Sequence, residues 1–326
     1  MNSNRRIAVI LNPRAAGGRT GKRWPEVARA LEQRLGPVTV RFTERPGHAT
    51  LLARELLKSG FDLIAGAGGD GTFNEIANGM LEADEPARPG ACLGIIPAGT
   101  GGDFQRMFFP APNLTDALET LATGEPYEID VGKVAYDTPQ GVHGERYFVN
   151  LVSFGMGGAV AAGARNFLSP LGGRAAFLWS TFRVLLTYRG RGVKLIVNGS
   201  GIESPFFITN VAVGNGRFHG GGMFPCPTAV LNDGVLEVTV IEYMNMFRLL
   251  RDIHYLYSGR IYSHPKIHHL RATHLDAAAQ MSTWIEVDGE PLGKLPVTIT
   301  VLPRRLPVMI SGALAKSWAA AAAPPS

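Results

Sequence analysis

Short apolar segments alternate with longer amphipathic segments over the first 124 residues of the chain. The apolar segments predict β-strands, and the amphipathic segments, with their helical spacing of apolar positions, predict α-helices. The predicted strands are residues 7–11, 38–42, 63–65 and 92–96, and the predicted helices are residues 24–35, 48–58, 74–80 and 114–122. This order predicts a parallel sheet flanked by helices, in which ligands bind in the loops that follow the carboxyl ends of the strands.

The pattern changes after residue 124 to strand-like segments with alternating polarity, which predict an antiparallel β-sandwich. The predicted strands are residues 127–136, 147–154, 193–198, 206–213, 235–241, 284–287 and 297–302, and two helices are predicted at 172–188 and 246–258. The sequence therefore predicts an α/β domain at 1–124 and a β-rich domain at 125–303. Residues 304–318 are a candidate return to the first domain, and 319–326 form a low-complexity, flexible tail.

The composition is that of a folded globular protein, with 45% hydrophobic and 18% charged residues. Cys92 and Cys226 stand far apart in apolar surroundings, which predicts a reducing compartment. The first residues lead into a strand-like segment rather than an apolar signal core, and no apolar stretch approaches the roughly twenty residues that a membrane span requires. We therefore expect a cytoplasmic protein whose membrane contact is peripheral.

The positive charge of the chain is unevenly placed. The formal net charge is +5, and residues 146–202 contain seven Arg or Lys residues and no Asp or Glu. An anionic membrane surface or a phosphate-bearing ligand suits this stretch better than nucleic acid, because aromatic and basic interleaving and zinc-finger spacing are both missing. Segment 165–194 either docks on an anionic bilayer or is a core-facing helix with snorkelling arginines, and both interpretations stay open.

A glycine-rich turn joins the third predicted strand to the third predicted helix, with the sequence G-G-D-G-T at residues 68–72. Gly66, Gly68 and Gly71 also match G-x-G-x-x-G, but a dinucleotide fingerprint belongs to the first β-α-β unit, and no P-loop ending follows. Backbone N–H groups at a helix N-terminus suit phosphate oxygens, so Asp70 implies either Mg²⁺ or a structural hydrogen bond. A tight turn with Thr72 as the N-cap is the alternative.

Further motifs follow other predicted strands. They read N-P-R-A-A-G-G at 12–18, P-A-G-T-G-G-D-F at 97–104, G-N-G-R-F-H-G-G-G-M at 214–223, N-D-G-V-L-E-V at 232–238 and V-D-G-E-P at 287–291. In this order, and over nearly the whole chain, they resemble the diacylglycerol kinase catalytic family, which includes bacterial lipid kinases and sphingosine and ceramide kinases. The G-G-D-G-T signature is shared with NAD kinases and 6-phosphofructokinases, so the resemblance implies a fold of that type for the first domain.

The resemblance also implies roles for individual residues. The implied ATP-binding residues are Asn12, Pro13, Arg14, Ala15, Ala16, Thr43, Gly69, Asp70, Gly71, Thr72, Phe73, Asn74, Glu75, Thr100 and Asp103. It implies a structural Mg²⁺ near Val230, Asp233 and Val235, held partly by main-chain carbonyls, and a second Mg²⁺ contact at Asp70. Glu290 is implied as the catalytic base, with Asp288 beside it. The chain departs from the family at Ala15, Gly102 and Thr228, where Ser, Asn and Asp are frequent.

The expected activity is transfer of phosphate from ATP to a hydroxyl of a lipid such as diacylglycerol or phosphatidylglycerol, because phosphoryl transfer needs positioning, charge neutralisation and a proton acceptor. An NAD kinase-like activity and a non-catalytic lipid or nucleotide sensor are the alternatives. The residues alone also allow Asp288 and Gly289 to be a simple hairpin turn. His264, His268 and His269 are expected on a solvated face. The expected partners are ATP, a lipid alcohol and an anionic membrane surface but not nucleic acid, and a homodimer is left open.

Overall fold

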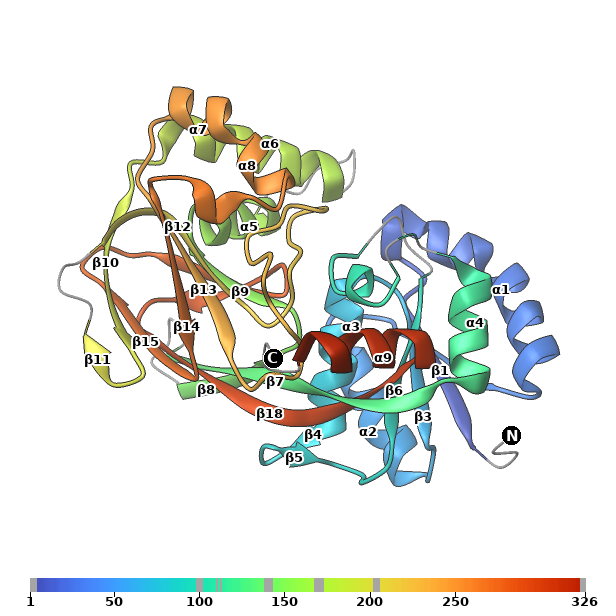
Figure 1. Cartoon of the computed structure of the whole chain (residues 1–326). Coiled ribbons are helices and arrows are strands. Elements are labelled where there is room, and N and C mark those ends of the chain that lie inside the picture. The colour runs from blue at the N-terminus through green and yellow to red at the C-terminus, as the bar shows by residue number, and fades with distance from the viewer. Residues whose placement is uncertain are drawn as a thin grey trace. The chain divides into compact units, whose positions relative to one another are not determined.

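A computed structural model describes residues 5–97, 102–109, 111, 113–137, 143–166, 173–201 and 206–322. The chain divides into two compact units. Unit 1 contains Met1–Val131 and Leu302–Ser326, and unit 2 contains Gly132–Val301. Two long paired strands, β7 (Glu125–Asp137) and β18 (Val297–Ile310), carry the chain from one unit to the other (Figure 1).

Unit 1 is built on a parallel sheet. Its strands are β1 (Ile7–Leu11), β2 (Thr39–Phe42), β3 (Leu63–Ala67) and β6 (Cys92–Ile96), and their order in the sheet is β2-β1-β3-β6. The end of β18 adds to β6, where Val308 pairs with Leu93 in parallel. Every residue of β3 and β6 is buried, as expected for a parallel sheet covered on both faces.

The helices of unit 1 are α1 (Arg19–Leu35), α2 (His48–Lys58), α3 (Asp70–Met80), α4 (Leu114–Thr123) and α9 (Gly312–Ala322). The η1 (Ala15–Gly18) and η2 (Gln105–Met107) segments are short 3₁₀-helices, and β4 (Leu81–Glu82) pairs with β5 (Glu85–Pro86). One core cluster joins side chains of α1 and α4 to the sheet strands. The structure thus confirms the predicted α/β fold with a parallel sheet.

Three details of unit 1 differ from the sequence-based expectations. Helix α1 begins at Arg19 rather than 24, because Gly21 can lie against Pro13, where a Cβ would meet the Pro13 carbonyl at 2.9 Å. Helix α3 has Gly69 as its N-cap, so the interpretation of Thr72 as the cap is wrong. Residues 319–322 of the predicted tail continue α9.

Unit 2 is an antiparallel structure, as predicted. Its strands besides β7 and β18 are β8 (His143–Phe148), β9 (Leu151–Gly155), β10 (Arg191–Val197), β11 (Ser200–Gly201), β12 (Phe206–Gly214), β13 (Leu236–Glu242), β14 (Ile267–Ala272), β15 (His274–Ala279), β16 (Trp284–Val287) and β17 (Glu290–Lys294). The order β17-β16-β9-β12-β10-β15-β18 forms the main path, and β13 joins β12 to β14. A large apolar cluster lies inside these strands.

Four helices lie at one end of unit 2. They are α5 (Met156–Asn166), α6 (Gly173–Thr187), α7 (Met246–Asp252) and α8 (His254–Tyr257), followed by the 3₁₀ segment η3 (Ile261–Ser263) (Figure 1). Helix α5 was not predicted, and the predicted helix 246–258 is divided into α7 and α8. The first part of the hypothesised docking segment, with Phe167 and Leu168, lies outside the described residues.

The predicted strand at 147–154 is interrupted by a turn, because residues 147–148 end β8 and residues 151–154 belong to β9. Strand β14 was missed because half of its residues are polar, and β15 was missed because its three alanines give no strand signal. The polar residues of β14 are satisfied across the sheet, since His268 contacts Glu242 at 2.7 Å and His269 contacts Glu237 on β13. The expected solvated face is also wrong for His264, which is buried and lies 3.1 Å from Asp252.

Candidate functional site

The loop after β1 is organised by Asn12. Its side-chain Oδ1 accepts a hydrogen bond from the Arg14 N–H at 3.0 Å, and its Nδ2 donates to Thr72 Oγ1 at 3.3 Å. Ala16, Gly17 and Gly18 then adopt left-handed backbone conformations in succession. Residues 12–16, predicted from the sequence as one phosphate-binding loop, therefore lie directly beside the predicted loop that contains Thr72.

Asp70, in the first turn of α3, binds the loop that follows β6 at Asp103 and Phe104. One carboxylate oxygen, Oδ2, accepts the Asp103 N–H at 2.7 Å, and the other, Oδ1, accepts the Phe104 N–H at 3.0 Å. The sequence left Asp70 as either a Mg²⁺ ligand or a structural acceptor, and these two bonds fit the structural role. The loops after β1, β3 and β6 meet at one edge of the sheet through Asn12, Thr72 and Asp70.

Several of the predicted ATP-binding residues have side chains that serve the fold of unit 1. Phe73 and Asn74 are fully buried in α3. The Glu75 carboxylate accepts the backbone N–H of Gly47 at 2.7 Å and of Ala49 at 2.9 Å, which caps the N-terminus of α2. Any contact of Phe73 or Asn74 with a phosphate would therefore be made through the backbone at the helix N-terminus.

The remaining predicted residues of unit 1 lie around these loops. The backbone N–H of Thr43 donates to the Leu11 carbonyl at 2.9 Å, at the end of β2 next to the Asn12 loop. The Asp103 carboxylate is almost buried, and its Oδ1 lies 3.7 Å from Arg106 Nε. Thr100 lies outside the described residues.

In unit 2, Asp288 and Gly289 form the two-residue turn between β16 and β17. Val287 pairs with Glu290, and the φ angles of 47° at Asp288 and 85° at Gly289 are both positive. Such angles are typical of the tight hairpin turn that Asp-Gly favours. The hairpin interpretation is confirmed, and it places Glu290 as the first residue of β17.

The Asp288 carboxylate anchors this hairpin to the turn between β8 and β9. Its Oδ1 accepts the backbone N–H groups of Asn150 at 3.1 Å and Leu151 at 2.8 Å, and its Oδ2 accepts the N–H of Val149 at 3.0 Å. Asp288 is only 5% exposed. Both oxygens of Asp288 are thus engaged with backbone N–H groups beside Glu290, the predicted base.

Glu290 is the accessible carboxylate of the hairpin, with a side chain that is 41% exposed. Arg146 Nη2 on β8 donates to Glu290 Oε2 at 2.9 Å. Within the described residues, the other oxygen of Glu290, Oε1, makes no hydrogen bond. The carboxylate is therefore fixed through one oxygen, which leaves the second available to accept a proton. Sequence reasoning did not assign Arg146 to the site, because a strand arginine far from Glu290 in the chain gives no pairing signal.

The loop at 214–223 is tied to the same turn. Asn150 accepts the backbone N–H groups of Asn215 at 2.9 Å and Gly216 at 2.8 Å through its carbonyl, and its Nδ2 donates to the Phe218 carbonyl at 3.0 Å. The motifs at 214–223 and 287–291, which are far apart in the sequence, thus meet around Asn150. Asn150 itself was not predicted, because it belongs to none of the glycine motifs.

A buried carboxylate, Glu286, supports this arrangement and was also missed. Ser153 Oγ donates to Glu286 Oε1 at 2.7 Å, and His219 Nε2 lies 2.7 Å from the same oxygen. Burial alone would raise the pKa of Glu286, but the His219 charge and the hydrogen bonds from His219 and Ser153 lower it below its usual value. The contact between His219 and Glu286 connects the loop at 214–223 to β16.

The residues around Asp233 fit a guanidinium better than a divalent metal. Asp233 Oδ1 accepts the Val235 N–H at 3.2 Å, Oδ2 pairs with Arg271, and Arg271 Nε also lies 3.3 Å from Glu237 Oε1. Thr228, where Asp is frequent in the family, hydrogen-bonds to Tyr262. Among the described residues no group of three His, Cys, Asp or Glu side chains could hold a metal ion. A structural Mg²⁺ near Val230, Asp233 and Val235 would therefore depend on main-chain carbonyls, as the family resemblance implies, and would compete with Arg271 for Asp233.

Thermal unfolding should therefore be insensitive to removal of divalent ions. EDTA should shift the melting temperature of the protein by less than about 2 °C, because Arg271 already neutralises Asp233 and Glu237. Arg271→Met should lower the melting temperature, and excess Mg²⁺ should restore part of that loss. The control is Arg34→Met, which removes an exposed ion pair with Glu119. The melting temperature of this control should not respond to Mg²⁺. A large drop for the unmodified protein in EDTA would show that a metal is bound after all.

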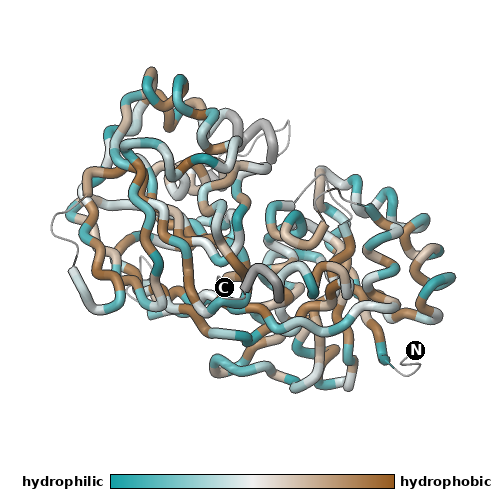
Figure 2. The backbone as a smooth tube through the Cα atoms, viewed as in Figure 1, coloured by the Kyte–Doolittle hydropathy of each residue, from teal (hydrophilic) through white to brown (hydrophobic). Residues whose placement is uncertain are grey.

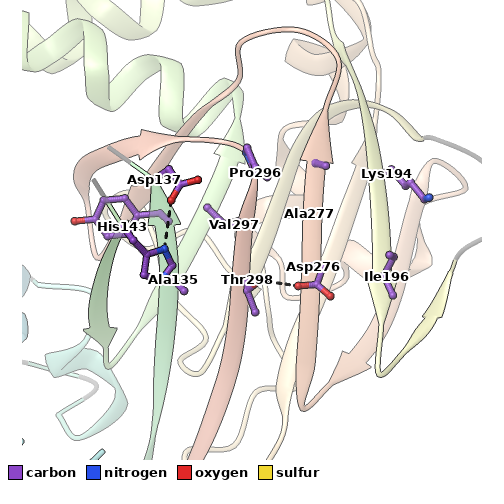
Figure 3. A pocket seen from close by; sticks show the side chains of 12 residues that line it. Ala135, Asp137, His143, Lys194, Ile196, Asp276, Ala277, Pro296, Val297 and Thr298 are labelled. Carbon is purple, nitrogen blue, oxygen red and sulfur yellow. Dashed lines mark hydrogen bonds and ion pairs between the residues drawn. The ribbon is translucent and has the colours of Figure 1, made fainter. Parts of the chain in front are cut away.

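A groove of about 220 Å³ also opens on unit 2, among β7, β8, β10, β15 and β18 (Figure 3). Its two acidic side chains are engaged within the protein, since Asp137 pairs with His143 at 3.3 Å and Thr298 donates to Asp276 at 2.6 Å, and Lys194 also lines the groove. None of the sequence-predicted site residues lines it. The sequence-predicted residues thus form two separate candidate regions, the phosphate-binding loops of unit 1 and the Asp288–Glu290 hairpin of unit 2.

Comparisons with known proteins cover most of the chain. The family model of the diacylglycerol kinase catalytic domain matches residues 6–134, and that of the YegS C-terminal NAD kinase beta sandwich-like domain matches 150–310. A diacylglycerol kinase of Staphylococcus saprophyticus subsp. saprophyticus is 28% identical over 309 residues, which cover 93% of this chain and 95% of that protein. A relative of the same name from Staphylococcus aureus is also 28% identical over 309 residues, covering 93% and 92% of the two chains.

A solved structure shares the fold. The crystal structure of a protein from Bacillus anthracis str. Sterne, provisionally assigned as a diacylglycerol kinase, superposes with a TM-score of 0.73 at 25% identity. The alignment covers 95% of this chain and 98% of that one. The similarity therefore extends over both units.

Proposed function

The chain belongs to the diacylglycerol kinase catalytic family, and from that premise we propose that it transfers the γ-phosphoryl group of ATP to a hydroxyl group of a lipid. The observation that carries the proposal is Glu290, a half-exposed carboxylate on a hairpin that Asp288 fixes through three backbone hydrogen bonds. A proton acceptor held on a rigid turn is what general-base catalysis requires. Diacylglycerol and phosphatidylglycerol are the proposed acceptors.

On the nucleotide side, the loops that meet through Asn12, Thr72 and Asp70 are proposed to bind the phosphates of ATP. The first N–H groups of α3 have no acceptor within the helix, so they suit phosphate oxygens, and the helix dipole favours negative charge there. When bound with ATP, Mg²⁺ would neutralise charge on the phosphates. Asp70 supports this role by fixing the chain at Asp103 and Phe104 with its two oxygens.

On the acceptor side, Glu290 Oε1 is proposed to take the proton of the lipid hydroxyl. The hydroxyl oxygen then forms a bond to the γ-phosphorus, the bond from that phosphorus to the β,γ-bridging oxygen breaks, and ADP leaves. Arg146 holds the opposite oxygen of Glu290 at 2.9 Å, which orients the carboxylate without covering Oε1. The proton thus ends on Glu290 and passes to solvent.

Gly102 provides a test of the nucleotide loops. A Cβ at this position would lie 2.6 Å from Asp70 Oδ1, which cannot move away without losing its bond to the Phe104 N–H. Gly102→Ala should weaken ATP binding by about tenfold, since a one-ångström displacement of positioning groups is costly. Isothermal titration with ATP measures this. Gly192→Ala, which places a Cβ in open space, is the control, and equal affinities of the two variants would contradict the role of the Asp70 contact.

Two alternatives share parts of this site. An NAD kinase-like activity would use the same G-G-D-G-T loop, and a non-catalytic sensor would keep the fold without turnover. Incubation with radiolabelled ATP and, in parallel, diacylglycerol, phosphatidylglycerol, ceramide, sphingosine and NAD separates all three. The proposal expects label in a lipid lane, whereas label in NAD alone supports the first alternative and an absence of label in every lane supports the second.

The proposed acceptor places the enzyme at a membrane surface, with peripheral contact as the proposed mode. No helix in the described part of the chain is long and apolar enough to cross a membrane. A cytoplasmic location remains part of the proposal, and Cys92 and Cys226, which are both buried and free, are compatible with a reducing compartment.

A further inference from the structure

Helices α6, α7 and α8 of unit 2 expose large apolar side chains to solvent. We call this set the helical face: Trp179, Phe182, Leu186, Phe247, Leu250, Ile253 and Tyr257. Phe247 is 78% exposed and Phe182 is 55% exposed. Among the described residues, most of the exposed large apolar side chains belong to this face. A gathering of this size on one end of a unit marks an interaction surface rather than ordinary surface composition.

The helices are held in place by other side chains, so folding does not explain the helical face. Leu185 of α6 and Leu256 of α8 pack against a buried cluster that includes Leu249 of α7. The same helices therefore have an inner apolar side toward unit 2 and an outer apolar side toward solvent. Figure 2 shows both hydrophobic and hydrophilic residues along α7 and α8. The contacts of the inner side are enough to hold these helices on unit 2. The outer apolar side chains are therefore available to bind a partner.

The charges around the helical face are complementary to an anionic partner. Residues 173–197 contain no Asp or Glu, and Arg183 lies between Phe182 and Val184 in α6. In α7, Arg248 and Arg251 both contact Asp252, but Arg251 is 70% exposed whereas Asp252 is only 10% exposed. The acid is thus covered while the guanidinium faces solvent. Arginines beside exposed aromatic and aliphatic side chains are typical of helices that lie in the surface of an anionic bilayer.

We infer that the helical face docks on an anionic lipid bilayer, with its apolar side chains inserted among the headgroups and its arginines at the lipid phosphates. The inference rests on the proposed function in that a lipid acceptor is presented by a membrane. It extends the sequence hypothesis for segment 165–194 in one respect, because it assigns a large share of the docking surface to α7 and α8. The sequence analysis predicted a helix over these residues, Met246–Asp252 and His254–Tyr257, but did not assign it to docking.

The test is sedimentation of the full chain with vesicles of phosphatidylcholine, with or without phosphatidylglycerol. The unmodified protein should bind the anionic vesicles, and less so at high salt. A double variant, Phe247→Asp with Leu250→Asp, should bind them at least about tenfold more weakly. Met281→Asp is the matched control, because Met281 is 61% exposed but lies outside the helical face, and it should bind like the unmodified protein.

Arg251→Gln should separate the electrostatic part of docking from the apolar part. It should reduce the preference for anionic over neutral vesicles by about fivefold, which corresponds to roughly one basic residue near the surface. Failure of the unmodified protein to bind anionic vesicles would overturn the inference. Equal vesicle binding by the double variant and the Met281→Asp control would also overturn the inference. So would a double variant that binds vesicles normally but no longer forms a dimer in light scattering.

Phosphorylation assays distinguish failure of docking from failure of the proposed function. With a water-soluble short-chain diacylglycerol, the double variant should retain its rate within about twofold, while its rate on diacylglycerol in anionic vesicles should fall at least about tenfold. Equal loss on both substrates in a variant that melts normally would place these side chains in the reaction site and overturn the docking role. If no lipid is phosphorylated but vesicle binding still depends on the helical face, docking stands and the kinase proposal fails.

Discussion

Replacing Glu290 with glutamine should slow phosphoryl transfer by about 10²–10⁴-fold, the usual contribution of a positioned general base. The amide keeps the size of the side chain and can still accept a hydrogen bond from Arg146, which lies 2.9 Å from Oε2. It cannot accept the hydroxyl proton. The affinity for ATP should be unchanged, because the proposed nucleotide loops lie in unit 1 and Glu290 belongs to unit 2.

Steady-state kinetics with diacylglycerol and titration with ATP measure the two quantities separately. Glu145→Gln is the matched control, because Glu145 is a half-exposed carboxylate of the same unit that pairs with Lys133 at 2.9 Å, and its rate should stay near that of the unmodified enzyme. Normal turnover by Glu290→Gln would remove Glu290 from the role of base. An equal loss of rate in Glu145→Gln would show that removing any carboxylate charge from this unit slows the reaction, so the effect would not be specific to Glu290.

Replacing Asp288 with alanine should destabilise the protein by about 3–5 kcal/mol, because buried N–H groups that lose their acceptor each cost about 1–3 kcal/mol. The three affected groups are the backbone amides of Val149, Asn150 and Leu151. The left-handed backbone at residue 288, with φ of 47°, adds a further cost for alanine. The loss should appear as a lower urea midpoint of the full chain.

Two further variants, Asp288→Asn and Glu290→Gln, serve as comparisons for the stability of Asp288→Ala. Asparagine tolerates the left-handed conformation and keeps one acceptor oxygen, so the Asn variant should recover part of the stability. Glu290→Gln should leave the urea midpoint unchanged. An Asp288→Ala protein that is fully stable but inactive would contradict the positioning role and return Asp288 to direct chemistry.

The sequence predicted the sheet of unit 1 well because β1, β3 and β6 are short and apolar and are followed by glycine- or proline-containing loops. Residues 7–11 and 92–96 were placed without error for this reason. Helix α1 was predicted too short because its first turn contains Gly21, whose close contact with Pro13 cannot be read from local preference. In unit 2, β14 was missed because the acids that satisfy its histidines, Glu237 and Glu242, lie on a different strand.

The candidate site was predicted in part for similar reasons. Glycine motifs are contiguous, so the loops at Asn12 and Asp70 and the hairpin at Glu290 could be located from the sequence. Arg146 and Asn150 could not, because each acts on a segment more than sixty residues away. The structure also distinguishes roles that a motif cannot, since Asp70 and Asp288 accept backbone hydrogen bonds while Glu290 stays accessible.

The most direct test of the central claim is the fate of two differently labelled ATP molecules. The purified full chain is incubated with diacylglycerol and ATP that carries radioactive phosphorus at either the γ or the α position, and the lipid is extracted. The account predicts that the γ label appears in the lipid, that the α label does not, and that Glu290→Gln abolishes most of the signal. If γ-labelled ATP labels none of the acceptor lipids named above, the proposed kinase activity is contradicted.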